Sequence, residues 1–136
     1  MTNYEINSLL QKEINFQGCF MRDEQLPKHG NFILNLDNSN GVGTHWVAVD
    51  LDRGYYYDAY GLCPPDDLKR IKFKKYNTIQ HQRSKSNLCG LYAIYFIHNL
   101  NRGLKFYNIV YDLLKFNTFN KSNHEQLRNL LSEMQT

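Results

Sequence analysis

Four residues of this chain have the types and the order needed for attack on a carbonyl by a thiol: His45, Asp58, Gln82 and Cys89. A thiol needs a base to take its proton, and the base needs a carboxylate to hold its ring. The carbonyl oxygen gains negative charge during attack and needs hydrogen-bond donors. We interpret Cys89 as the nucleophile, His45 as the base, Asp58 as its orienting group and Gln82 as the oxyanion donor. Each residue alone is ordinary, so the prediction rests on the set.

The nucleophile precedes a run that is apolar nearly all round, from Cys89 to Leu100, which predicts a buried helix. A thiol in the first turn of a helix lies at the positive end of the helix dipole, which lowers its pKa. Gly90 has no side chain, so a substrate backbone can approach there. On Cys89 and Gly90 alone, a small apolar core residue is the commoner outcome.

Two strands position the base and its carboxylate. Residues 45–51 and 55–60 both have the composition of strands, and the tight turn at Asp52-Arg53-Gly54 predicts an antiparallel hairpin. His45 begins the first strand and Asp58 lies near the end of the second. Because the strands run in opposite directions, both side chains are expected at the same end of the hairpin.

The other elements are shorter or less distinctive. Residues 18–30 contain breakers and are expected to be irregular. The pattern also predicts an opening helix from a capping box at Thr2 to about residue 14, a strand at 32–36, a helical turn at 66–68, a strand at 72–80, a helix at 106–116 and a C-terminal helix with a second capping box at Ser122.

Two assignments stay open at this point. Trp46 could wall a substrate cleft or pack in the core, and the two interpretations carry equal weight. Gln80 competes with Gln82 for the oxyanion role, because residues two apart in an extended segment face the same side.

Basic residues alternate with apolar ones between Arg70 and Lys74. In an extended segment Arg70, Lys72 and Lys74 would share one face, with Ile71 and Phe73 on the other. A solvated outer face is the commoner explanation of such a stripe. Its functional alternative is contact with the phosphates of DNA.

Composition narrows the class of protein. The chain has 136 residues, 42% of them apolar, which predicts one domain, 1–136, with its own core. Its net charge of +3 does not by itself indicate nucleic-acid binding. Three cysteines at wide spacings predict free thiols in a reducing compartment, not a disulfide framework or a structural zinc site. We expect no membrane span, no secretory signal, no metal and no cofactor.

The segments around these residues resemble the adenain-like cysteine proteases, within the wider group that includes the SUMO-deconjugating proteases. Residues 45–48, His-Trp-Val-Ala, resemble the family's His-Trp-Met-Ala, and residues 58–61, Asp-Ala-Tyr-Gly, resemble Glu-Pro-Phe-Gly. Gln82 precedes Cys89 by seven residues, which is the adenoviral spacing. Residues 123–127, Asn-His-Glu-Gln-Leu, resemble Asn-Gln-Glu-Gln-Leu near the end of the adenoviral enzyme.

The resemblance implies an α+β fold of the papain-like type, with a central, mostly antiparallel or mixed sheet flanked by helices. It implies the catalytic roles given above for His45, Asp58, Gln82 and Cys89, with Trp46 and Gly90 beside the substrate. It further implies a viral endopeptidase, which we expect to be a monomer. Small size, cysteine usage and a composition typical of AT-rich coding fit a virophage, a related small DNA virus or a transposon. Such an enzyme cuts capsid or core precursors after small residues such as Gly during virion maturation, in the virion and in the infected-cell cytoplasm or virus factory.

Two other functions are compatible with the same residues. A ubiquitin- or SUMO-type deconjugating isopeptidase would use the same four side chains and would also cut after glycine. A virion nucleic-acid-binding protein could keep the fold without catalysis, although the complete set of four residues argues against that alternative.

Overall fold

A five-stranded mixed sheet forms the centre of the molecule in the computed structural model, which describes residues 2–37, 45–68, 70–78 and 89–114 together with Asn129 and Ser132. The strands are β1 (Phe16–Met21), β2 (Asn31–Asn35), β3 (Trp46–Asp50), β4 (Tyr55–Tyr57) and β5 (Lys75–Tyr76), and they lie side by side in that order. The β2–β3 and β3–β4 pairs are antiparallel, whereas the two outer pairs are parallel. The predicted hairpin is therefore present.

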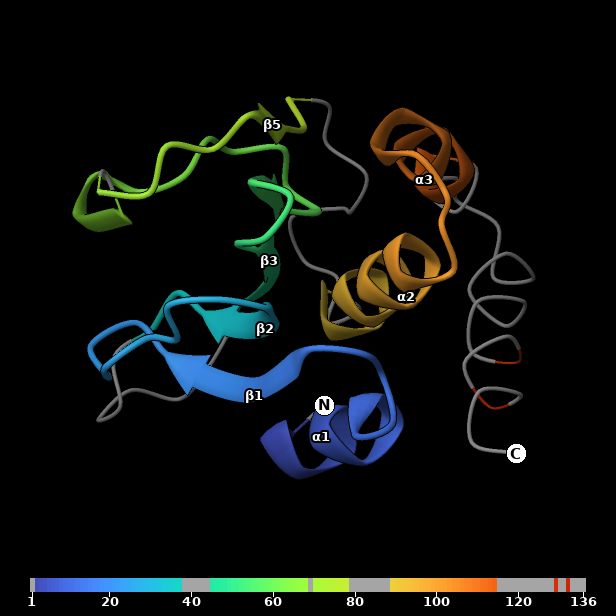
Figure 1. Ribbon diagram of the computed structural model, residues 1–136, viewed down its shortest axis with the longest axis horizontal. Helices are drawn as coiled ribbons and strands as arrows, with labels where there is room; N and C mark the ends of the chain where they lie inside the picture. Colours follow the sequence, from blue (N-terminus) through green and yellow to red (C-terminus); the bar gives the residue numbers. More distant parts are fainter. Residues whose placement is uncertain are drawn as a thin grey trace.

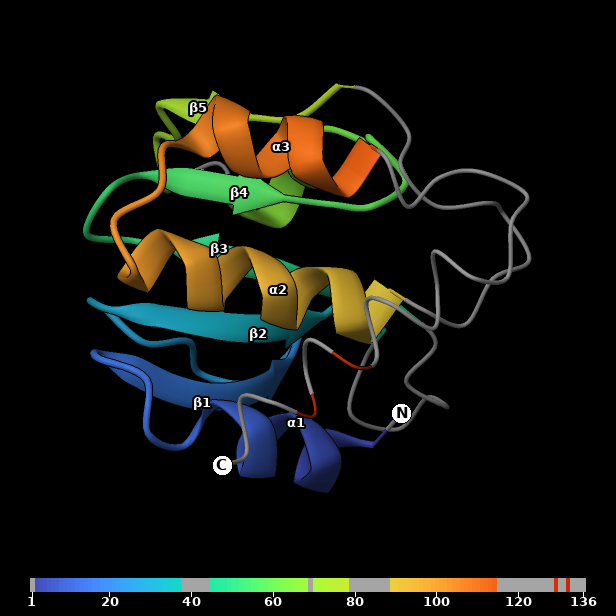
Figure 2. The ribbon, with the colours of Figure 1, turned by 90° about the vertical axis from the view of Figure 1, so that its right-hand side faces the viewer.

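In the described part of the chain, three helices pack on one face of this sheet, as can be followed in Figure 1. They are α1 (Asn3–Leu10), α2 (Cys89–Asn101) and α3 (Phe106–Leu114), and a 3-10 turn, η1, covers Asp66–Leu68. Helix α2 lies against β3, between α1 and α3 (Figure 2). All residues of β2 and β3 are buried, because the helices cover one face and loop residues cover the other. Burial on both faces explains the uninterrupted apolar runs of these strands.

The core has two parts, one on each face of the sheet. On the helix face, side chains of α2 such as Ile94, Phe96 and Ile97 pack against Ile33 and Tyr57. On the other face a smaller cluster forms around the apolar residues of β2 to β4, namely Phe32, Leu34, Val47, Val49 and Tyr56, together with Leu68. The strands that carry the candidate site are thus held from both sides.

Helix α1 begins at the predicted capping box but ends earlier than expected. The Glu5 N–H donates to Thr2 Oγ1, and the Thr2 N–H donates to Glu5 Oε2 at 3.0 Å. The helix ends at Leu10, not near residue 14, because residues 11–15 form turns; the last of them, Asn15, has a positive φ of 63° and leads the chain into β1.

Two expectations about strands need correction. Residues 18–30 were expected to be irregular, yet Phe16–Met21 form β1, whose pairing with β2 overrides the breaker Gly18. The strand predicted at 72–80 is reduced within the described residues to Lys75–Tyr76, because the Lys74 N–H donates instead to the turn carbonyl of Gly54. The predicted capping box at Ser122 lies outside the described residues, although Asn129 and Ser132 are helical.

Candidate active site

The sheet register and the start of α2 bring three of the four predicted residues together, at the end of the sheet where β3 begins and β4 ends. His45 immediately precedes β3, and Asp58 immediately follows β4. The pairing of Ala48 with Tyr57, extended beyond the last bridge, sets position 45 opposite position 60 and close to Asp58. The N-terminal end of α2, where Cys89 lies, is at the same edge as the C-terminal end of β4 (Figure 2).

His45 and Asp58 form a direct, largely buried contact. The His45 Nε2 and Asp58 Oδ1 atoms are 2.7 Å apart, and the exposed fractions of the two side chains are 13% and 0%. The other ring nitrogen, Nδ1, is buried and has no hydrogen-bond partner among the described residues. Since Asp58 occupies Nε2, Nδ1 is the ring atom left to exchange a proton with a thiol.

The thiol of Cys89 lies beside this pair, and its surroundings stabilise the thiolate. The residue is buried, and its Sγ accepts the Trp46 backbone N–H at 3.4 Å. Burial alone would raise the pKa of Cys89. The interactions with the His45 ring and with the backbone N–H groups of Trp46 and Gly90 outweigh burial and lower that pKa below the ordinary value of a thiol.

The same interactions favour the protonated imidazole. Burial of the ring works against its charge, but the hydrogen bond with Asp58 and the nearby thiolate of Cys89 raise the pKa of His45 to about 9. The thiol pKa falls while the imidazole pKa rises, which is the signature of a thiolate–imidazolium pair. Such a pair supplies a nucleophile and a general acid at neutral pH.

Two residues to which the sequence analysis gave no role surround Asp58. Asn77 is buried, and its side-chain amide bonds both the N–H and the carbonyl of Asp58. Tyr60 stacks on the His45 ring with centroids 4.3 Å apart and planes at 27°, while its backbone N–H donates to Asp58 Oδ1 at 2.8 Å. Tyr60 lies in the segment 58–61 that carries the resemblance, but neither this Tyr nor an Asn after a short strand carries a signal of such a role.

The remaining predicted site residues differ in how they relate to this centre. Trp46 is buried in the core on the helix face, so packing is the alternative that its surroundings support; it contacts the thiol through its backbone N–H. Gly90 follows Cys89 in the first turn of α2 and is also buried. Gln82 and Gln80 lie outside the described residues, and the oxyanion role stays a prediction.

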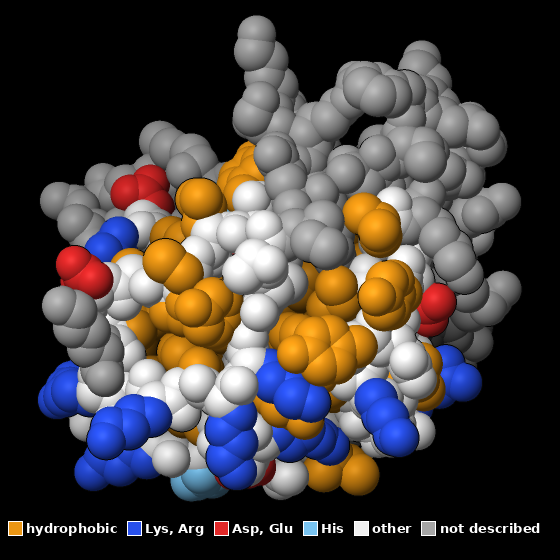
Figure 3. Space-filling view, turned by 90° about the horizontal axis from the view of Figure 1, so that it is seen from above, with side chains coloured by type: hydrophobic (Ala, Val, Ile, Leu, Met, Phe, Trp, Pro, Cys, Tyr) orange, Lys and Arg blue, Asp and Glu red, His pale blue; other side chains and the backbone are white. Residues whose placement is uncertain are grey.

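The basic stripe belongs to the surface. Arg70, Lys72 and Lys74 are exposed, whereas Ile71 and Phe73 pack against the smaller core cluster. The alternation is thus real although residues 70–74 are not a strand. Lys and Arg side chains gather along one side of the face in Figure 3. Contact of these three residues with DNA stays a prediction.

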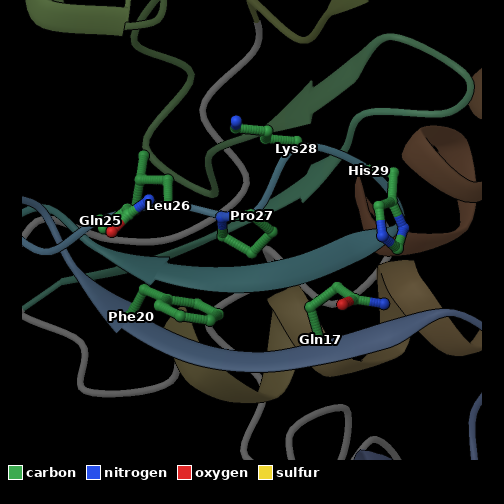
Figure 4. Close-up of a pocket in the computed structure, with 7 residues that line it drawn as sticks. All are labelled: Gln17, Phe20, Gln25, Leu26, Pro27, Lys28 and His29. Carbon is green, nitrogen blue, oxygen red and sulfur yellow. The ribbon is translucent and has the colours of Figure 1, made fainter.

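A hollow elsewhere on the molecule involves none of the predicted residues. A cavity of about 440 Å³ lies between β1 and the segment before β2, with Gln17, Leu26 and His29 in its wall (Figure 4). Among the described residues, no group of three or more His, Cys, Asp or Glu side chains is placed to hold a metal ion. Within the same residues, no helix has the length and apolarity that crossing a membrane requires.

The sequence is similar to viral proteins that are named as proteases. No family model matches the chain. The SUMO-1 cysteine protease of African swine fever virus is 33% identical over 86 residues, covering 48% of this chain and 31% of that protein. A protein of Acanthamoeba polyphaga mimivirus named as a thiol protease is 33% identical over 116 residues, covering 71% of this chain and 38% of that protein. The chain thus spans about a third of the length of these relatives.

The fold has a counterpart among solved structures. The crystal structure of an African swine fever virus protease superposes with a TM-score of 0.59 at 21% identity, covering 85% of this chain and 65% of the other. This likeness concerns the fold. It confirms the predicted α+β class with a mixed central sheet flanked by helices.

The first prediction concerns which thiol reacts. Iodoacetamide at mildly acidic pH should label Cys89 before Cys19, because burial raises the pKa of Cys19 to about 12 whereas that of Cys89 is lowered. Mass spectrometry of peptides from briefly treated protein reads the site directly. His45→Ala should slow labelling of Cys89, and Cys19→Ser should leave it unchanged. Preferential labelling of Cys19 would contradict the assignment of Cys89 as the reactive thiol.

The second prediction concerns pH. Activity should rise as Cys89 becomes a thiolate and fall as His45 loses its proton near pH 9. Asp58→Asn removes the charge that holds the proton on His45, so the falling limb of kcat/KM should move to lower pH and kcat should drop. His45→Ala should cost more, about 10²–10⁴-fold in kcat. A falling limb that stays in place in Asp58→Asn would remove Asp58 from its orienting role.

Proposed function

We propose that this chain is a cysteine endopeptidase of the viral adenain-like and SUMO-protease-like group. One observation carries the proposal: a thiol, an imidazole and a carboxylate meet at one edge of the sheet, with the pKa of Cys89 lowered and that of His45 raised. The similarity to two viral proteins named as proteases supports it.

In the proposed reaction, Cys89 Sγ attacks the scissile carbonyl carbon and the C=O electron pair moves onto oxygen. The His45 imidazolium then donates its proton to the leaving amine as the C–N bond breaks, which leaves a thioester on Cys89. His45, now neutral, takes a proton from water as the water oxygen attacks the thioester carbon. The C–S bond then breaks, which releases the acid and restores the Cys89 thiolate beside the protonated His45. Asp58 keeps the His45 ring oriented through both steps.

The oxyanion needs two donors in this scheme. The backbone N–H of Cys89 lies at the N-terminus of α2, where the first N–H groups of a helix have no intrahelical acceptor. The Gln82 side chain is the proposed second donor, as the family spacing suggests. Pre-oriented donors of this kind stabilise the transition state without any reorganisation.

The substrates we propose are capsid or core precursors of a virus, cut after Gly or another small residue within the virion or the virus factory. The viral origin of the matched relatives supports this source. Deconjugation of a SUMO- or ubiquitin-like protein is the second candidate, and the name of the African swine fever virus relative favours it. The two differ in whether the scissile amide is a peptide bond or a lysine isopeptide bond.

The third prediction separates these substrates. Purified protein should cleave peptides with Gly before the cut, and candidate capsid precursors incubated with it should yield new N-termini that follow a small residue. SUMO and ubiquitin conjugates serve as parallel substrates, and Cys89→Ala is the inactive control. Preference for a large residue before the cut would contradict the proposed specificity. Cleavage of conjugates alone would assign the chain to deconjugation.

The fourth prediction tests the oxyanion donor. Loss of one such donor costs about 10²–10³-fold in kcat, so Gln82→Ala should show that loss with little change in KM. Gln80→Ala is the matched control and should be close to the unmodified protein. If Gln80→Ala loses kcat and Gln82→Ala does not, Gln80 is the oxyanion donor.

A further inference from the structure

The backbone of Asp58 is held by a side chain where strand pairing ends. Strands β4 and β5 are parallel, and their last bridged pair is Tyr56 with Tyr76. Beyond it, the Asp58 N–H donates to Asn77 Oδ1 at 2.9 Å, and Asn77 Nδ2 donates to the Asp58 carbonyl at 2.6 Å. The amide of Asn77 therefore takes the place that a further peptide group of β5 would hold.

This double contact is specific to a side chain with one donor and one acceptor in a single plane. Asn77 is buried, with 4% of its surface exposed, and Asp58 is wholly buried. An Asn side chain offers both an NH₂ donor and a carbonyl acceptor, which Leu and Ala do not. Loss of either contact would leave a buried main-chain group of Asp58 with one partner fewer.

The position of the Asp58 backbone decides where its carboxylate lies. Asp58 Oδ1 accepts from two groups, His45 Nε2 at 2.7 Å and the Tyr60 N–H at 2.8 Å. Tyr60 also stacks on the His45 ring, and the Gly61 N–H donates to the Asp58 carbonyl. A shift of the main chain at Asp58 would therefore change the Asp58–His45 contact and the orientation of the ring together.

We propose that Asn77 is a positioning residue of the catalytic centre: its amide clamps the main chain of Asp58 and thereby sets the orientation of His45 toward Cys89. This role rests on the proposed function, since Asn77 acts through Asp58 and touches no reacting atom. It extends the site to the residue that follows β5, the edge strand of the sheet.

Three titratable groups lie around His45: Asp58, Cys89 and Tyr60. Asp58 follows β4, Cys89 begins α2, and both raise the pKa of His45. Tyr60 lies close enough to Cys89 and Asp58 for both to raise the pKa of its own hydroxyl, after burial. Displacement of Asp58 weakens its support for the imidazolium, which in turn weakens the support of His45 for the thiolate.

The fifth prediction uses Asn77→Leu, which is close in size to Asn, and the smaller Asn77→Ala; both lack the paired donor and acceptor and add no charge. Both should lower kcat roughly 10- to 100-fold with KM nearly unchanged, because misplacement by about 1 Å has effects of that order. The falling limb of kcat/KM against pH should also move to lower pH. Active-site titration with a thiol reagent corrects each value for the fraction of protein that is folded.

Asn31→Leu is the matched control for loss of a buried amide. Asn31 is 2% exposed, donates to the Ile14 carbonyl at 3.0 Å, and lies at the far end of β2 from the position that pairs with Trp46. The Asn31→Leu protein should lose thermal stability, while its kcat per titrated site and the falling limb of kcat/KM against pH stay unchanged. If the Asn77 variants, like Asn31→Leu, keep the kcat per titrated site and the pH of the falling limb, Asn77 is not a positioning residue.

A substrate-free measurement separates this inference from the proposed function. The rate of Cys89 alkylation by iodoacetamide against pH reports the thiolate and needs no peptide. In the Asn77 variants its midpoint should move to higher pH. If this shift occurs and the unmodified protein cleaves no substrate, the clamp stands and the proposed function fails. If peptides are cleaved and the midpoint does not move, the proposed function stands and the positioning role of Asn77 fails.

Discussion

The structure depends above all on one buried carboxylate, that of Asp58. An ionised group with no exposed surface is costly to bury unless it is paired and hydrogen-bonded. Its oxygen accepts from His45 and from the Tyr60 N–H, while Asn77 bonds its main chain. Each of these partners lies next to a different strand end: His45 before β3, Tyr60 after β4 and Asn77 after β5. The hairpin register and the segment after β4 must therefore be correct for the charge to be tolerated, and the residue after β5 must be in place to hold the main chain of Asp58.

An aromatic contact between the sheet and α2 places the Cys89 thiol beside the His45–Asp58 pair. Tyr57 immediately precedes Asp58, and its ring stacks on Phe96 of α2 with centroids 4.8 Å apart. Phe96 in turn meets Phe106 at the start of α3 edge-to-face. Such pairs contribute about 0.5–1.5 kcal/mol beyond the burial of their area. The stacking fixes α2 against β4, so the geometry of the core also sets the separation of Cys89 from the His45–Asp58 pair.

The sequence predicts the parts of the fold that have local causes. The turn at 52–54, the capping box at Thr2 and the apolar run after Cys89 each carry a pattern that depends on few neighbours. Strand β1 was missed because its pairing with β2 is a tertiary effect, and its Gly18 reads locally as a breaker. The role of Asn77 was missed for a similar reason: it contacts Asp58 from 19 positions away, through the parallel pairing of β4 and β5.

Two cysteines of this chain show why burial alone does not make a nucleophile. Cys19 and Cys89 both pack with the core on the helix face, and burial works against the thiolate in both. Within the part of the chain that the structure describes, the polar partner of the Cys19 sulfur is the carbonyl of Asn3, at 3.8 Å, and a carbonyl cannot donate to a thiolate. Cys89 has backbone N–H donors and a ring held protonated by Asp58. Reactivity in this fold is thus decided by the donors around the sulfur, and these donors exist because the hairpin and α2 end at the same edge.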